Sequence, residues 1–209
     1  KIIKSSESVS INFYGSLVKS QAYAAAAATA VGLGLGMNLL EIGEALKKYK
    51  GPKGRLKIIS GINNSIVIDD TYNASPSSTR LALEMLQELS GSRKIAVLGD
   101  MLELGQYAIE AHRDIGLITA ASADILVCVG PLAKFIAETS KIPKDKIFIF
   151  NTSNEAKFKI RGLIRERDII LVKGSQSMRM ENIVSEIMAE PENKKELLVR
   201  QSKHWLSKL

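Results

Sequence analysis

The feature that most constrains the fold is an alternation of short apolar runs and amphipathic segments that starts at Arg55 and continues to Met188. Each apolar run is followed by a turn and then by a stretch with the periodicity of a helix. Strands that are apolar throughout are buried on both faces, which is typical of a parallel sheet covered by helices on both sides. We therefore predict an α/β domain with a Rossmann-like, mostly parallel sheet.

The alternation also predicts the individual elements. Strands are expected at 56–59, 66–68, 94–98, 125–129, 147–150 and 169–172, and a hairpin through Gly61–Asn64 joins the first two. Helices are expected at 76–89, at 108–121, from Gly130-Pro131, after Thr152 and at 178–188. Thr152 and Glu155 form a capping-box pattern. The single cysteine, Cys128, lies in an apolar run, so we expect a small core residue rather than a reactive thiol.

The chain before Arg55 has a different character. It begins with a weak alternation at Val9, Ile11 and Phe13 and continues into helical patterns at 21–31 and 39–49. The stretch from Lys50 to Gly54, with two glycines and a proline, then breaks the pattern. These changes divide the chain into a small, mainly helical part (residues 1–53), the α/β domain (54–190) and a basic tail (191–209). The tail fits an extra helix and a partly ordered arm equally well.

The net charge of +7 is concentrated at the two ends of the chain. Residues 1–60 hold nine basic and three acidic residues, whereas residues 61–190 hold fifteen and seventeen. Nucleic-acid binders usually gather basic and aromatic residues on the folded module, and only 5% of this chain is aromatic. We therefore expect neither a nucleic-acid partner nor, because the apolar stretch 22–40 is rich in alanine, a membrane span.

The start of the chain and its single cysteine bear on its origin. The first residue is Lys1 rather than Met, and no signal peptide is visible, which favours a fragment of a longer protein. One cysteine permits no internal disulfide and suits a reducing compartment. We expect a cytoplasmic protein.

Three loops at the expected carboxyl ends of strands carry polar side chains, and ligands of open α/β sheets bind at that edge. Asp69–Pro76 contains two adjacent carboxylates, which suit ribose hydroxyls or a cation. Gly99–Gly105 contains Asp100 and Glu103, and His112 follows it. Lys173–Ser177 leads into a helix with Arg179 expected in its first turn, an arrangement suited to a carboxylate or phosphate.

Each loop also has a simpler interpretation. Ser75 and Pro76 suit the start of a helix, and a lone histidine such as His112 is more often structural than catalytic. The 209 residues contain no Walker A motif, no paired Cys/His metal-ligand spacing and no Gly-x-Ser-x-Gly elbow. We therefore expect no metal site within this chain.

Five stretches together resemble the Mur ligases, the ATP-dependent enzymes that add amino acids to the peptide of bacterial cell-wall precursors. They are Gly54-Arg55, residues 68–76, residues 96–105, His112 and residues 171–175. The resemblance covers about residues 9–190, and Asp69–Pro76 and Gly99–Gly105 are similar to the ligases that add D-Ala-D-Ala. It implies that residues 1–53 end a central ATPase domain and that residues 54–190 form the carboxy-terminal Rossmann-like domain.

The resemblance also implies a reaction and its site. ATP, with Mg²⁺, would activate the carboxylate of a UDP-MurNAc-tripeptide as an acyl phosphate, which the amine of D-Ala-D-Ala then attacks, in a monomeric enzyme. Arg55 would lie near the nucleotide phosphates, Asp69 or Asp70 at the ribose, and Tyr72 and Asn73 beside the nucleotide. The side that receives D-Ala-D-Ala would carry Asp100, Glu103, His112, Lys173, Gly174 and Ser175, and Arg55 and Lys173 would be the catalytic residues.

The chain departs from the family pattern before the alanine-rich helix. The family carries a His-Asn-x-x-Asn run whose last Asn meets adenine, and this chain has Leu17, Val18 and Gln21 at those places. Gln21 keeps an amide and is the candidate adenine contact. Gln176 also stands where an arginine is common.

The phosphate-binding loop of the family lies outside these residues, and it supplies most of the electrostatic stabilisation of phosphoryl transfer. We predict that the 209-residue chain alone has no ligase activity and keeps weak affinity for nucleotides. Two alternatives are a folylpolyglutamate synthetase, which residues 72–74 and 99–105 disfavour, and a non-catalytic Rossmann-like module that binds an anion or nucleotide.

Overall fold

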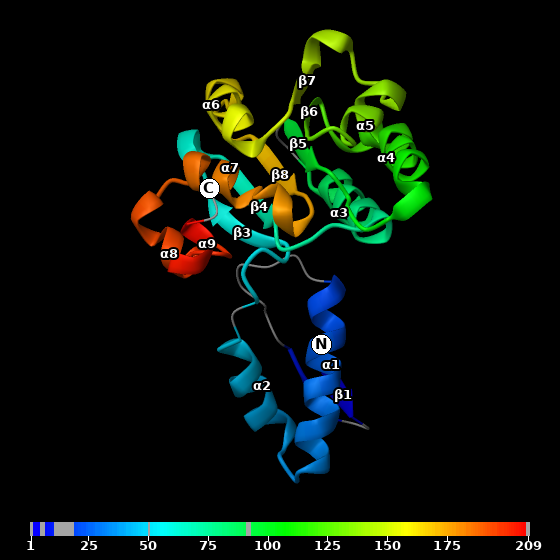
Figure 1. Ribbon diagram of the computed structural model, residues 1–209. Helices are drawn as coiled ribbons and strands as arrows, with labels where there is room; N and C mark the ends of the chain where they lie inside the picture. The colour runs from blue at the N-terminus through cyan, green and yellow to red at the C-terminus, as the bar shows by residue number, and fades with distance from the viewer. Residues whose placement is uncertain (1, 5–6, 11–18, 50, 91–92, 208–209) are drawn as a thin grey trace. The chain divides into compact units, whose positions relative to one another are not determined.

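The computed structural model describes residues 2–4, 7–10, 19–49, 51–90 and 93–207. The chain divides into two compact units, Lys1–Pro52 and Lys53–Leu209. Figure 1 shows the second as a sheet between two layers of helices. The alternation of apolar runs and amphipathic segments in the sequence therefore corresponds to the strands and helices of the second unit.

The first unit contains a short antiparallel pair, β1 (Ile2–Lys4) and β2 (Glu7–Val9), and two helices, α1 (Lys19–Gly34) and α2 (Leu39–Lys47). Asn38 caps α2 by accepting a hydrogen bond from the Glu41 N–H, and the Glu41 carboxylate accepts one from the Asn38 N–H, at 2.9 Å each. Ile11, Phe13, Leu17 and Val18 lie outside the described residues.

The second unit contains a six-stranded sheet in the order β3-β4-β8-β5-β6-β7. Five strands are parallel, and β3 pairs antiparallel with β4 through the predicted hairpin. Asn63 and Asn64 make that turn with φ of 56° and 54°, a conformation that asparagine tolerates better than most residues. The mostly parallel α/β sheet confirms the predicted fold class. The strands are β3 (Lys57–Ser60), β4 (Ile66–Asp70), β5 (Lys94–Gly99), β6 (Ile125–Val129), β7 (Ile147–Phe150) and β8 (Ile169–Lys173).

Helices cover both faces of the sheet (Figure 1). On one face α6 (Ser153–Leu163) and α7 (Glu181–Ile187) pack on alternate strand residues such as Val67, Val97 and Val172. The other face carries α3 (Pro76–Glu88), α4 (Ala108–Ser122) and α5 (Lys134–Thr139), which lie side by side. Because side chains alternate across a strand, an apolar run supplies both cores at once.

Two helices begin later than predicted. The helix expected from Gly130-Pro131 begins at Lys134, after a turn. The helix expected at 178–188 begins at Glu181, because Arg179 has a φ of 53° and ends a short 3₁₀ helix, Gln176–Met178. A left-handed residue interrupts the i to i+4 hydrogen bonding that an α-helix needs.

The residues after Pro191 pack on the second unit. They form a 3₁₀ turn (Pro191–Asn193) and two short helices, α8 (Lys194–Leu197) and α9 (Lys203–Leu206). Leu198, between the two helices, is only 1% exposed and belongs to the same core cluster as α6 and α7. Up to Ser207, the segment is therefore part of the folded unit.

Cys128 lies in the middle of β6 and is fully buried, as predicted for a small core residue. Burial raises the pKa of its thiol to about 12, so it stays protonated at neutral pH. Among the described residues, no helix combines the length and the apolar character that crossing a membrane requires.

Candidate functional site

The strand order brings the three predicted loops together at one edge of the sheet. β4 and β8 are neighbours, with Asp70 paired in register with Lys173, and β5 lies on the other side of β8. The loops that follow these three strands therefore leave the same edge of the sheet next to one another, which is where open α/β sheets bind ligands.

Asp70 and Lys173 form a buried ion pair at this edge. Lys173 Nζ lies 2.6 Å from Asp70 Oδ2, and the two side chains are 2% and 11% exposed. The same ammonium donates to the backbone oxygen of Asn73 at 3.0 Å, and Asp70 Oδ1 accepts from the Leu56 N–H at 3.1 Å. The pair therefore ties the end of β8 to the loop after β4 and to the start of β3.

Arg55 and Tyr72 stand beside this ion pair and are both exposed. The guanidinium carbon of Arg55 lies 4.1 Å from the centre of the Tyr72 ring, a cation–π contact. The Tyr72 N–H donates to the backbone oxygen of Gly54 at 2.9 Å, which holds the two loops together. An exposed guanidinium and an exposed aromatic ring are suited to a phosphate and to a flat base or sugar face.

Asp69 points away from Asp70, as alternate strand residues do. It is fully buried, and its Oδ1 accepts from the Thr71 hydroxyl at 2.6 Å and from the Thr71 N–H at 3.2 Å. Among the described residues, Oδ2 has no hydrogen-bond partner. Burial raises the pKa of Asp69 to about 6, and Thr71 opposes that shift. Asp69 is therefore bound to its own turn, and the ribose contact expected of Asp69 or Asp70 stays a prediction.

Two residues expected on the D-Ala-D-Ala side, His112 and Ser175, accept hydrogen bonds from backbone N–H groups of the loop after β5. His112 is fully buried, and because its Nε2 accepts from the Met101 N–H at 2.9 Å, its Nδ1 carries the proton and donates to Ala108 O at 2.6 Å. Ser175 Oγ accepts from the Leu102 N–H at 2.8 Å. Both ring nitrogens of His112 thus bind backbone groups, as expected for a structural histidine.

Asp100 has a similar role at the end of β5. Its Oδ1 accepts from the N–H groups of Leu132 at 3.0 Å and Ala133 at 2.7 Å, and the residue is 2% exposed. Burial raises the pKa of this carboxyl, and the hydrogen bond from Ala133 opposes the shift. Asp100 thereby joins the loop after β5 to the loop after β6.

Gly174 and Glu103 occupy the remaining part of the predicted acceptor side. A Cβ on Gly174 would lie 2.7 Å from Met180 Cγ and 3.1 Å from Gly99 Cα, so this approach of two loops requires glycine. Glu103 is exposed and has a φ of 64°. Of the acceptor-side residues, Glu103 is the one whose carboxylate reaches solvent.

Arg179 was expected in the first turn of a helix, but it ends a 3₁₀ helix and precedes α7. Its Nε donates to Glu181 Oε1 at 2.7 Å and its Nη1 to the Trp205 backbone oxygen at 3.0 Å. The Arg179 side chain therefore joins α7 to the carboxy-terminal segment.

Sequence reasoning missed Arg200, which donates three hydrogen bonds to the backbone oxygens of Thr71 and Tyr72. Burial lowers the pKa of its guanidinium, and the Glu181 carboxylate opposes that shift. Arg200 lies 129 residues from Thr71 in a segment that was treated as a tail, so no local pattern connected the two.

Gln21, the candidate adenine contact, is buried in α1 of the first unit. The adenine contact expected of Gln21 stays a prediction.

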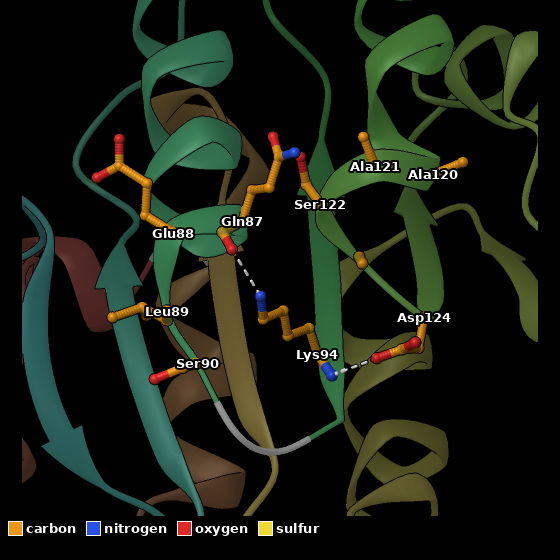
Figure 2. Close-up of a pocket in the computed structure, with 10 residues that line it drawn as sticks. Gln87, Glu88, Leu89, Ser90, Lys94, Ala120, Ala121, Ser122 and Asp124 are labelled. Carbon is orange, nitrogen blue, oxygen red and sulfur yellow. Dashed lines mark hydrogen bonds between the residues drawn. The ribbon is translucent and has the colours of Figure 1, made fainter.

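A pocket of about 490 Å³ lies at the opposite edge of the sheet, where β5 begins (Figure 2). Figure 2 shows that Lys94 closes the end of α3: its Nζ donates to Gln87 O and its backbone N–H to Asp124, at 2.8 Å each. Because this edge carries the amino ends of the parallel strands, we do not place the site there.

Comparison with known proteins decides the family. Residues 54–176 match the family described as Mur ligase, glutamate ligase domain. This chain belongs to the Mur ligase family. The matched range lies within the second unit and contains every candidate site residue except Gln21 and Arg179.

The relatives and solved structures similar to this Mur ligase chain include D-alanyl-D-alanine-adding ligases, also called MurF. It is 33% identical over 141 residues to the UDP-N-acetylmuramoyl-tripeptide–D-alanyl-D-alanine ligase of Bacillus subtilis, covering 66% of this chain and 31% of the relative. A crystal structure of MurF from Acinetobacter baumannii matches with a TM-score of 0.72 and 34% identity, covering 80% of this chain and 37% of that one. MurF ligase from Thermotoga maritima, solved in complex with ADP, gives a TM-score of 0.70 and 27% identity, with coverages of 86% and 40%. The chain thus spans about a third of the length of the curated relative.

Proposed function

We propose that this chain is part of an ATP-dependent, amide-forming ligase that adds D-Ala-D-Ala to a UDP-MurNAc-tripeptide in peptidoglycan precursor synthesis. Family membership and the names of the relatives support the reaction. The observation that carries the site is the cluster of Arg55, Tyr72, Asp70 and Lys173 at the ends of β4 and β8. We further propose that residues 1–53 end the central ATPase domain and that the enzyme is a cytoplasmic monomer.

In the proposed reaction, a carboxylate oxygen of the tripeptide attacks the γ-phosphorus of ATP, which forms an acyl phosphate and releases ADP. The amine of D-Ala-D-Ala then attacks the acyl carbon, and phosphate leaves as the amide forms. Negative charge on the transferred phosphoryl group needs fixed cationic partners, and Arg55 is an exposed guanidinium at the candidate site.

The nucleotide half of the proposed site consists of Arg55, Asp70, Tyr72 and Asn73, with Gln21 as the adenine contact. Asp70 is proposed to accept from a ribose hydroxyl in addition to its bonds with Lys173 and Leu56. Lys173 was expected to meet a substrate directly, but its ammonium is buried between Asp70 and Asn73. We propose that Lys173 acts by fixing these two groups.

The acceptor half is proposed to be the surface around Glu103 and Gly174. The exposed carboxylate of Glu103 suits the ammonium end of a dipeptide. Asp100, His112 and Ser175 are proposed to support this surface from beneath, through the backbone groups that they bind.

Mg²⁺ would neutralise charge on the ATP phosphates. Over the described ranges, no group of three or more His, Cys, Asp or Glu side chains is arranged to hold a metal ion. We propose that its protein ligands lie outside this chain.

Titration of the ¹⁵N-labelled chain with ADP, followed by NMR, tests the nucleotide half. We expect shifts concentrated at Arg55, Tyr72 and Asn73, and we expect Arg55→Ala to weaken binding about tenfold, the scale of one charge-assisted contact. Arg113→Ala is the matched control, because Arg113 is an exposed arginine over the Phe135 ring. Shifts confined to other edges of the sheet would overturn the proposed site.

The alternative is a non-catalytic module that binds an anion or nucleotide. Both functions predict binding of ADP, so binding does not separate them. Ligase activity of the longer protein containing this chain does, since the module predicts no amide product from ATP, UDP-MurNAc-tripeptide and D-Ala-D-Ala.

A further inference from the structure

The carboxy-terminal segment contacts the loops of the candidate site. We propose that residues 195–205, which we call the strap, hold Arg55 and Tyr72 in place, and that Arg200 is the positioning residue of the nucleotide site. This inference rests on the proposed function, because it assigns a role in nucleotide binding to residues outside the matched family range.

The first observation is the contact between Arg200 and the turn after β4. Arg200 Nη1 and Nη2 donate to Thr71 O at 3.0 and 2.8 Å, and Nη2 donates to Tyr72 O at 2.7 Å. Thr71 is fully buried, so its carbonyl depends on such a donor. One guanidinium thereby fixes two consecutive peptide groups, and the second belongs to the exposed aromatic residue of the site.

The second observation concerns Gly54, the residue before Arg55. A Cβ on Gly54 would lie 2.9 Å from Val199 Cγ1 and 3.0 Å from the Tyr72 nitrogen. Gly54 also has a φ of +66°, and its carbonyl accepts from the Tyr72 N–H. Val199 of the strap therefore packs on the point where the Arg55 and Tyr72 loops meet.

Lys53 adds a further bond between the strap and the Arg55 loop. Its Nζ donates to the Lys195 backbone oxygen at 2.8 Å. Lys53, Gly54 and the Thr71–Tyr72 turn are thus all contacted by residues 195–200, although these segments are more than a hundred residues apart in sequence.

Buried contacts anchor the strap to the second unit. Leu198 is buried in the core, and the Arg200 side chain is 5% exposed. Glu181, which is 1% exposed, accepts from Arg200 at 3.1 Å with one oxygen and from Arg179 at 2.7 Å with the other. Arg179 in turn donates to Trp205 O at 3.0 Å.

The backbone at Arg200 is unusual for an arginine. Its φ is 56°, in the left-handed region that residues with a side chain rarely adopt. Such a conformation persists where surrounding contacts determine it, and here the contacts lead to Glu181 and to the Thr71–Tyr72 turn. The exposed Arg167 has a similar φ of 63°, so the buried contacts of Arg200, rather than its backbone conformation, support its role in placing the turn.

Arg200→Lys tests the inference, because a lysine keeps the charge but cannot bridge two carbonyls and a carboxylate in the same geometry. Two quantities are measured on the 209-residue chain by NMR: the affinity for ADP and the hydrogen exchange of the Tyr72 amide. We expect ADP binding to weaken about tenfold and the Tyr72 amide to exchange faster, while the melting temperature falls by only a few degrees.

Arg161→Lys is the matched control. Arg161 also binds one carboxylate and one backbone oxygen, both of Glu186, but it is 56% exposed and belongs to α6. We expect this variant to leave both quantities unchanged.

The outcomes separate the inference from the proposed function. If Arg200→Lys speeds exchange at Tyr72 but binds ADP as tightly as the unaltered chain, Arg200 is structural only and the inference is overturned. Unchanged exchange overturns it as well. If the unaltered chain shows no binding of ADP, the proposed nucleotide site fails, and the role of Arg200 in it fails for that separate reason.

Discussion

At the residue scale, the site depends on the Asp70–Lys173 ion pair. Both groups are almost completely withdrawn from water, so each is stabilised by the other and by backbone groups. Taking one partner away leaves an unpaired buried charge, whereas removing both charges does not. The ion pair therefore holds the loops of the site together, and removing one of its two charges destabilises the fold.

Lys173→Met tests this dependence. We expect the free energy of unfolding to fall by about 3 to 5 kcal/mol, because the Asp70 carboxylate loses its counter-ion. Adding Asp70→Asn should restore part of the loss. In denaturant unfolding, Arg113→Ala serves as control, since its pair with Glu138 is half exposed and is worth less than about 1 kcal/mol. A double variant as unstable as the sum of the single ones contradicts the argument.

Asp69 predicts a pH dependence of stability. Its pKa rises from 3.8 to about 6 on folding, so the folded state holds the proton more tightly than the unfolded state. The stabilisation is fully present below about pH 4 and is lost as the pH rises through about 6, a total on the order of 3 kcal/mol. Asp70 and Glu181 favour the protonated form further.

The measurement compares the unaltered chain with Asp69→Asn in urea unfolding from about pH 4 to about pH 7. Between these pH values, we expect the unaltered chain to lose about 2 to 3 kcal/mol of unfolding free energy relative to Asp69→Asn, because the aspartate titrates and the amide does not. Parallel pH profiles would show that Asp69 titrates at its ordinary pKa.

At the scale of elements, the layer of α3, α4 and α5 depends on a close approach at Gly116. A Cβ there would lie 2.0 Å from Thr139 Oγ1 and 2.3 Å from Ile136 O of α5. The carbonyl belongs to the helix backbone and cannot turn away, so the two helices would have to separate. Gly162 on α6 has no atom within 4 Å of the same added carbon and provides the matched comparison.

We expect Gly116→Ala to lower the free energy of unfolding by about 2 kcal/mol, within the range seen when well-packed sites are overfilled. Gly162→Ala should raise it by up to about 1 kcal/mol, because alanine favours the helix and its unfolded chain has fewer conformations. Thermal or urea unfolding measures both. Equal effects of the two substitutions would contradict the packing described for α4 and α5.

At the scale of the whole molecule, the chain carries the strand-end loops of a Mur ligase but no Walker A motif. Phosphoryl transfer needs preorganised donors around the phosphates, and one arginine supplies only part of them. We therefore expect the 209-residue chain to release no phosphate from ATP in the presence of UDP-MurNAc-tripeptide and D-Ala-D-Ala. Steady-state release above that of a heat-inactivated sample contradicts this expectation.

The elements and the family could be predicted from the sequence, whereas several side-chain roles could not. The runs 125–129 and 169–172 predicted parallel strands because apolar periodicity is a local property. The start of α7 was predicted three residues too early, because apolar periodicity does not reveal the left-handed conformation of Arg179 that ends a 3₁₀ helix. His112 is a second example. Its residue type permits catalysis, but in the folded chain it is buried and bound to the Met101 N–H.

By itself, the sequence determined the alternation of strands and helices, the edge of the sheet that carries the polar loops, and the resemblance to Mur ligases. These follow from local periodicity, turn residues and motif spacing, which need no knowledge of distant contacts. Only the tertiary structure decided that Lys173 faces Asp70 and that Arg200 holds the Thr71–Tyr72 turn. Both contacts join residues more than a hundred positions apart. Because only the folded chain brings such residues within hydrogen-bonding distance, no local sequence pattern reveals these contacts.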